Sequence, residues 1–140
     1  EAQYIAGMGF SNVGLGIVHS MAHPLGAFYD TPHGVANATL LPYVMEYNAE
    51  SPSRAKYLDI ARAMGVKTDG MSVDEGVRAA IDAVKALSLS IRIPQRLHEL
   101  GVREEDIPAL AVAAFNDVCT GGNPRPTSVE EIERLYHIAY

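Results

Sequence analysis

Three of the chain's five histidines, His19, His23 and His33, lie within a stretch of fifteen residues. Neutral imidazole is the commonest protein ligand for a divalent first-row metal, and such an ion needs several donors about 2 to 2.2 Å away. A single histidine is more often an ordinary polar or core residue. Three in one short stretch favour a role in metal binding.

The spacing of these histidines suggests how a fold would bring them together. His19 and His23 are four residues apart, which on a helix places their Cβ atoms about 5 to 6 Å apart on one face, so helical geometry alone nominates them as a ligand pair. His33 lies beyond Pro24, where we expect that helix to stop, and therefore belongs to another element. Glycines at positions 14, 16, 26 and 34 would let a ligand come close, and tight helix packing explains them equally well.

The histidine stretch does not hold a complete metal site. It contains no H-E-x-x-H or C-x-x-C motif and no acidic residue within one turn of the His19/His23 pair, and Asp30 is the only carboxylate nearby. The remaining ligands of a bound metal must come from elsewhere in the chain or from outside it.

Composition predicts one domain over residues 1–140, because 48% of the residues are hydrophobic and the length suffices for a core. The net charge of -6, without a basic run, argues against a nucleic-acid partner. No apolar run reaches the roughly 20 residues that span a bilayer and no signal-peptide pattern is present, so we expect no membrane association and a soluble, cytoplasmic protein. Cys119 is the single cysteine, which excludes an intrachain disulfide and fits a reducing compartment.

The pattern of apolar residues and helix caps predicts an all-α fold, a helical bundle. Helix starts are indicated by N-cap residues followed by a glutamate or a proline, at Ser72/Glu75, Thr127/Glu130 and Ser51/Pro52, the last helix running to Gly65. Further helices are expected over about 2–22, 34–48 (bent at Pro42), 94–100 and 105–117, with loops over 24–33, 66–71, 89–93 and 118–127 and a turn at Asn123. No nucleotide-binding motif is present.

The start of the chain bears on domain organisation. Glu1 is not an initiator methionine, and the residues that follow it already show an apolar, small-residue pattern typical of the middle of a helix. We therefore expect the domain to begin upstream, in a longer protein.

Three runs of the sequence carry a family resemblance: GMGFSNVGLGIVHSMAHPLGAFYDTPHGVANATLLPYVMEYN, RIPQRLHELGVREEDIPALA and DVCTGGNPRPTSVEEIERLYHIAY. They resemble the carboxy-terminal half of an iron-dependent (group III) alcohol dehydrogenase, nearest to the lactaldehyde reductase (1,2-propanediol oxidoreductase) branch. The resemblance covers essentially the whole chain, and its G-x-x-H-x-x-x-H-P-L-G...H-G pattern is specific. It implies a helical domain that follows an NAD(P)-binding α/β domain and holds a metal in the cleft between the two.

The resemblance also implies roles for individual residues. His19 and His33, rather than His19 and His23, match the two metal ligands of this stretch, and the other two family ligands would precede the first residue. His23 matches a residue beside the nicotinamide, which casts it as a catalytic, proton-relaying residue in contact with the cofactor. Phe10 and Cys119 match positions that face the substrate, although a free cysteine is also a common small buried residue.

The implied reaction interconverts a short-chain aldehyde such as lactaldehyde with its alcohol, 1,2-propanediol. The metal, iron(II) by family habit with zinc equally suited to imidazole, would act as a Lewis acid on the aldehyde oxygen, and NAD(P) would carry the hydride. We expect these 140 residues alone to be inactive, and to form a homo-oligomer, a dimer, through an exposed apolar face over residues 10–33. A free-standing helical binding or interaction module without catalysis is the alternative.

Overall fold

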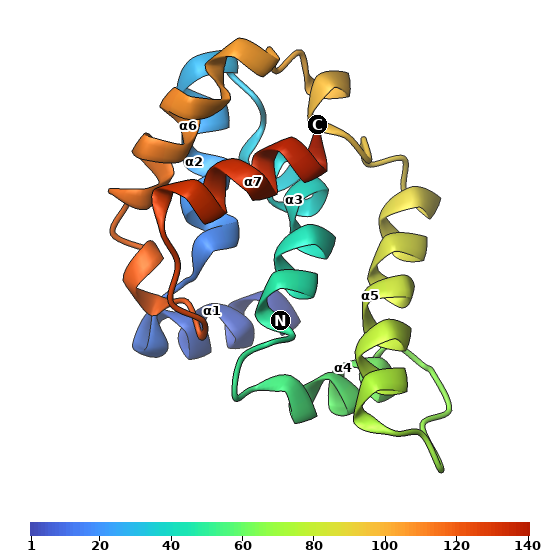
Figure 1. Cartoon of the computed structure of the whole chain (residues 1–140). Helices are drawn as coiled ribbons and strands as arrows, with labels where there is room; N and C mark the ends of the chain where they lie inside the picture. The colour runs from blue at the N-terminus through green and yellow to red at the C-terminus, as the bar shows by residue number, and fades with distance from the viewer.

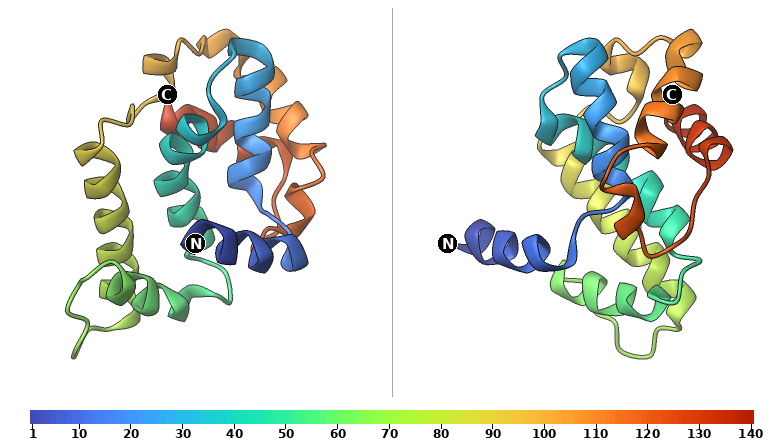
Figure 2. Two further views of the ribbon diagram at one scale, coloured as in Figure 1. Left: turned by 180° about the vertical axis from the view of Figure 1, so that it is seen from behind. Right: turned by 90° about the vertical axis from the view of Figure 1, so that its left-hand side faces the viewer.

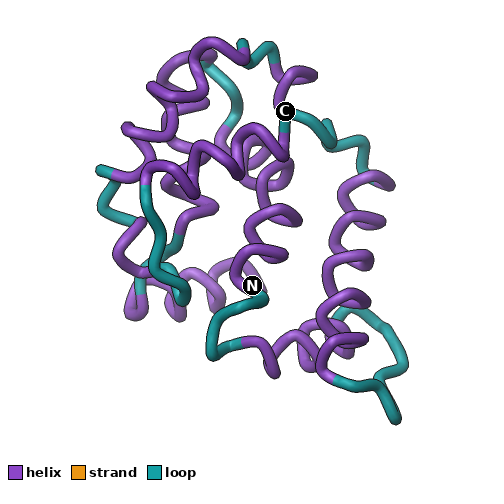
Figure 3. Tube along the Cα trace, in the orientation of Figure 1, coloured by secondary structure: helices purple, strands orange, loops and turns teal.

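The computed structural model describes the backbone of all 140 residues and the side chains of all except Phe10, Asn12 and Val13. Every regular element in this description is helical, which confirms the all-α prediction (Figure 3). The α-helices are α1 (Ala2–Val13), α2 (Ile17–Tyr29), α3 (His33–Asn48), α4 (Tyr57–Ala63), α5 (Val73–Ser90), α6 (Ile107–Phe115) and α7 (Val129–Ala139). Single turns of 3-10 helix are η1 (Arg54–Lys56), η2 (Leu97–Leu100), η3 (Glu104–Asp106) and η4 (Thr120–Gly122).

Helices α2, α3, α6 and α7 surround the main hydrophobic core, while α5 lies alongside α3 and α4 crosses the end of that pair (Figure 1). Apolar side chains of α2 that recur at helical spacing, Ile17, Met21 and Leu25, are fully buried in this core. A smaller cluster joins the end of α3 to α4 and α5 through residues such as Ala61 and Ile81. The histidine-bearing helices α2 and α3 are therefore held from several sides.

Helix α1 projects from the rest of the molecule (Figure 2). Its side chains Tyr4 and Ile5 are 69% and 57% exposed. The expectation of an exposed apolar face over residues 10–33 is wrong for most of α2, because Ile17, Met21 and Leu25 lie in the core, although Phe28 near its end is 51% exposed. Exposed apolar side chains lie on α1 as well, outside most of the expected range.

The predicted helix over 2–22 is two helices, and the predicted loop over 24–33 is mostly helical. The chain breaks at residues 14–16, where Gly14 has a φ of 82° that favours glycine. Helix α2 then continues through Pro24 to Tyr29, and the link to α3 shrinks to residues 30–32. Proline inside a helix costs about 3 kcal/mol, so the buried contacts of Met21, Pro24 and Leu25 outweigh the lost backbone hydrogen bond.

Of the predicted helix starts, the one at Ser72 is confirmed. Glu75 N–H donates to Ser72 Oγ at 3.3 Å, and Ser72 N–H donates to Glu75 Oε2 at 2.7 Å, which is a complete capping box. The pairing of Thr127 with Glu130 is wrong by one residue, because Ser128 caps α7 by accepting from the backbone N–H of Glu131 at 3.2 Å.

Other predicted boundaries also shift. Ser51 does not start a helix: residues 50–53 turn first, and α4 follows η1 and ends before Gly65, whose φ is 88°. The region 94–100 holds only the 3-10 turn η2, and 105–117 holds η3 followed by α6. The helix predicted over 34–48 is confirmed as α3, with Pro42 inside it.

Within the part of the chain that the structure describes, no helix combines the length and the apolar character needed to cross a membrane.

Candidate metal and active site

The fold brings His19, His23 and His33 into one cluster. His19 and His23 lie one turn apart on α2, and His33 is the first residue of α3 after the short link that reverses the chain. Ring centroids are 5.4 Å apart for His19 and His33, 5.4 Å for His23 and His33, and 6.2 Å for His19 and His23. All three imidazoles therefore border the same space.

The ring orientations distinguish the possible ligand pairs. Two imidazoles bound to one tetrahedral ion, with metal–nitrogen distances of about 2.1 Å, have ring centroids about 5.3 Å apart. His19 and His33 lie at such a separation, with their planes tilted by 47°. His23 and His33 are stacked, with ring planes 19° apart, so their in-plane lone pairs lie in two nearly parallel planes and do not converge on one ion. Of the three pairs, His19 with His33 best fits a shared ion.

The surroundings of His19 favour the form that can bind a metal. Burial lowers the pKa of His19, the neighbouring His33 and His23 lower it further, and Asp117 partly opposes them. A lowered pKa keeps the ring neutral at neutral pH, with a lone pair available for coordination. The donor chemistry of the His19/His33 pair thus suits a first-row divalent ion.

His23 is held by a carboxylate that sequence reasoning missed. Its Nδ1 lies 2.7 Å from Oδ2 of Asp117, which follows α6, and the two side chains are 38% and 19% exposed. Burial raises the pKa of Asp117, but hydrogen bonds from the Cys119 backbone, from His23 and from the Cys119 thiol hold it below its usual value. Because an ionised carboxylate only accepts, Nδ1 of His23 carries a proton, and in the neutral form of the ring the lone pair is therefore on Nε2.

Cys119 lies beside the same carboxylate. Its backbone N–H donates to Oδ1 of Asp117 at 2.8 Å. Burial raises the pKa of the Cys119 thiol, and the hydrogen bond to Asp117 raises it further, so the thiol stays protonated. The structure thus brings Cys119 to the histidine cluster. The predicted substrate contact Phe10 lies on α1, but its side chain is outside the described residues.

The loop after Asp117 is clamped against the start of α2. A Cβ on Gly122 would lie 2.1 Å from the carbonyl oxygen of Leu15, so only glycine fits there. Gly16 offers no side chain to cap α2, and Asn123 Oδ1 accepts from Ile17 N–H at 3.4 Å in its place.

Asn123 does more than shape the predicted turn. Its amide exchanges two hydrogen bonds, of 2.8 and 3.0 Å, with the amide of Asn48 at the end of α3. One loop residue therefore ties together the two helices that carry the histidines and the segment that carries Asp117. No local sequence pattern predicts these contacts, because Asn48 and Asn123 lie 75 residues apart in the chain.

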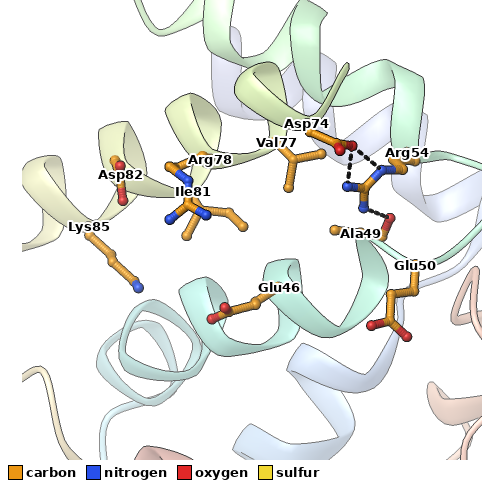
Figure 4. A pocket seen from close by; sticks show the side chains of 10 residues that line it. All are labelled: Glu46, Ala49, Glu50, Arg54, Asp74, Val77, Arg78, Ile81, Asp82 and Lys85. Atoms are coloured by element: carbon orange, nitrogen blue, oxygen red, sulfur yellow. Dashed lines mark hydrogen bonds and ion pairs between the residues drawn. The ribbon is translucent and has the colours of Figure 1, made fainter. Parts of the chain in front are cut away.

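A hollow between α3 and α5 has a different character from the histidine cluster (Figure 4). Charged side chains of both signs line it. The guanidinium of Arg54 donates hydrogen bonds to Oδ1 of Asp74 at 2.6 Å and to the carbonyl oxygen of Ala49 at 2.7 Å. It contains no histidine or cysteine among its described lining residues. Among the described residues that line the two regions, histidine and cysteine side chains occur only at the histidine cluster.

In a comparison with known protein families, residues 1–140 match the family described as "Fe-containing alcohol dehydrogenase family, C-terminal". The chain belongs to this family. It is 65% identical over 138 residues to lactaldehyde reductase of Escherichia coli K12, covering 99% of this chain and 36% of that protein. It is 47% identical over 139 residues to 1,3-propanediol dehydrogenase of Citrobacter freundii, and this match covers 99% of this chain and 36% of that protein.

Solved structures share the fold. An alcohol dehydrogenase from Oenococcus oeni is 41% identical, with a TM-score of 0.92, and the match covers 96% of this chain and 35% of that one. The chain thus has the helical fold of the carboxy-terminal part of iron-containing alcohol dehydrogenases, and spans about 36% of the length of the curated relatives named above.

Proposed function

We propose that this chain forms the metal-binding side of the active site of an NAD(P)-linked alcohol dehydrogenase that interconverts a short-chain aldehyde, such as lactaldehyde, with its alcohol. The observation that carries the proposal is the approach of His19 and His33 to 5.4 Å, with ring planes that allow both to face one ion. Membership of the iron-containing family and 65% identity to a lactaldehyde reductase support it.

His19 and His33 would hold the ion, iron(II) in the first instance, with zinc compatible with the same imidazoles. When bound, the ion supplies Lewis-acid polarisation of the carbonyl oxygen. Two protein ligands are few for a catalytic site, so further ligands would come from residues outside this chain.

His23 would move the proton that the reaction needs. In aldehyde reduction a proton must reach the oxygen of the former carbonyl, and in alcohol oxidation it must leave. Asp117 holds the proton on Nδ1, so Nε2 is the atom that accepts and passes on the transferred proton. Cys119, a neutral thiol beside this pair, would border a small substrate together with Phe10.

The hydride donor would be bound by a part of the protein outside these 140 residues, since the chain matches only 36% of its relatives' length. Hydride transfer needs the nicotinamide held against the carbonyl, so we expect the 140-residue chain by itself to show no turnover. The exposed apolar side chains of α1 would be covered in the complete protein, by its own remaining chain or by a second copy in a homo-oligomer.

The test is a chimera in which this chain replaces the matching segment of E. coli lactaldehyde reductase. We expect NADH-dependent reduction of lactaldehyde and one bound metal per chain. His19→Ala and His33→Ala should each lose the metal, measured by elemental analysis of the dialysed protein. His23→Ala should keep it and lose about 10²- to 10⁴-fold in kcat, the range for general acid–base catalysis.

The exposed histidine His137, on α7, provides the matched control, because His137→Ala removes an imidazole that lies outside the cluster. It should leave both metal content and turnover unchanged. Retention of metal in His33→Ala with its loss in His23→Ala would contradict the proposal, because the helical pair His19 and His23 would then be the ligands.

A further inference from the structure

We propose that His23, Asp117 and Cys119 form a second divalent-cation site, separate from the His19/His33 pair and suited to a thiophilic ion such as Zn²⁺. Each of the three side chains offers one ligand atom, and these atoms all lie within 4.8 Å of one another. No other described group of three or more such residues has this arrangement.

The distance between His23 and Asp117 needs little adjustment to accept an ion. Around tetrahedral zinc, ligand atoms at about 2.0 to 2.3 Å from the metal lie about 3.3 to 3.6 Å from each other. The hydrogen bond from His23 Nδ1 to Asp117 Oδ2, at 2.7 Å, would open by less than 1 Å as the ion takes the place of the proton. Imidazole, carboxylate and thiolate are the three side-chain ligands that zinc uses, and water would complete the set.

Two of the three ligands are positioned before any ion binds. Asp117 Oδ1 accepts the backbone N–H of Cys119 at 2.8 Å, and Thr120 N–H donates to the carbonyl oxygen of Asp117 at 3.1 Å, so the two ligand side chains share one fixed turn. Thr120 Oγ1 anchors this turn to the carbonyl of Ala114 in α6 at 2.7 Å. A turn already fixed by hydrogen bonds loses little freedom when it binds an ion.

The third ligand comes from α2, and it gives the site a consequence for the reaction. An ion coordinated by His23 would prevent this residue from carrying out the proton transfer assigned to it above. His19 and His33 would still bind their own metal. Excess zinc would then inhibit turnover without displacing that metal. This consequence rests on the proposed function, whereas the ion-binding site itself does not.

The experiment uses Cd²⁺, a probe whose bond to a thiolate gives a charge-transfer absorption in the ultraviolet. Cys119 is the only cysteine of the chain, so the band reports on this residue alone. We expect a saturable band with one Cd²⁺ per 140-residue chain and competition by Zn²⁺. Cys119→Ser should abolish it, and Asp117→Asn and His23→Ala should each weaken the affinity at least tenfold. The double variant His19→Ala/His33→Ala should bind as the parent does.

Every other outcome overturns the proposal. Wild-type affinity in both Asp117→Asn and His23→Ala would mean that the thiol binds Cd²⁺ without them, and absence of the band would mean that no site exists. Loss of the band in the double variant would place the thiol and the His19/His33 pair on one ion. Circular dichroism of each variant separates these results from unfolding, and Asp117→Asn preserves the shape of the side chain.

Discussion

The hydrogen bond between His23 and Asp117 joins residues 94 positions apart, so no local motif contains it. Residue type and spacing alone point to the three histidines, because imidazole is the usual ligand and all three lie in one stretch. Spacing alone would also nominate His19 and His23 as the metal-ligand pair, because sequence spacing reports only which residues share a face of one helix. The approach of His33 to His19 depends on the reversal of the chain at residues 30–32, which only the fold supplies.

Asp117→Asn in the chimera tests the tautomer argument at the level of one residue. An amide can donate to Nδ1, which would favour the proton on Nε2 and remove the lone pair needed for proton transfer. We expect kcat to fall about 10- to 100-fold with metal content and KM little changed. The ¹⁵N chemical shifts of the His23 ring in the 140-residue chain should report the change of tautomer. Unchanged kcat with unchanged shifts would refute the role given to Asp117.

At the scale of the elements, local signals predicted what depends on local interactions. The capping box of α5 involves Ser72 and Glu75 only, and it was predicted correctly. Pro24 was expected to end a helix, but the burial of its neighbours in the core decides the outcome. The adjacent hydroxyl residues Thr127 and Ser128 are each followed three residues later by a glutamate. Both are therefore possible caps for α7, and sequence spacing alone does not choose between them.

Glycine substitutions in the loop 116–128 test how it is held against α2. Gly122→Ala would place a Cβ 2.1 Å from the Leu15 carbonyl oxygen, so the loop or α2 must shift. We expect a loss of about 3 kcal/mol in the free energy of unfolding, the upper end for overpacking. Gly121→Ala is the matched control, because its Cβ meets no atom within 4 Å. Equal unfolding midpoints in urea for the two variants would show that the contact does not position the loop.

At the scale of the whole molecule, the core connects helices that are distant in sequence. Tyr136 of α7 is fully buried, and its hydroxyl donates to the carbonyl oxygen of Met21 in α2 at 2.6 Å, across 115 residues. The sequence predicted the helical class and the amphipathic character of α7. Periodicity says which face of a helix is buried but not which helix it meets, so this contact could not be read from the pattern.

The buried hydroxyl of Tyr136 makes stability depend on alkaline pH. Burial raises the pKa of Tyr136 above its ordinary value of 10.0, so above pH 10 the unfolded chain releases this proton while the folded chain keeps it. The unfolded state then binds fewer protons, and the free energy of unfolding falls by about 1.4 kcal/mol per pH unit from this residue. Below pH 10 this contribution is fully present.

Tyr136→Phe separates the hydrogen bond from the titration. At pH 8 the variant should be less stable by about 1 kcal/mol, because the hydroxyl no longer donates to Met21. Between pH 10 and 11 the parent should lose stability faster than the variant, since phenylalanine has no proton to release. The other tyrosines titrate in both proteins and cancel in the difference. Urea unfolding followed by circular dichroism from pH 8 to 11 measures the two curves, and a constant gap over that range would mean that Tyr136 ionises as readily in the folded chain as in the unfolded one.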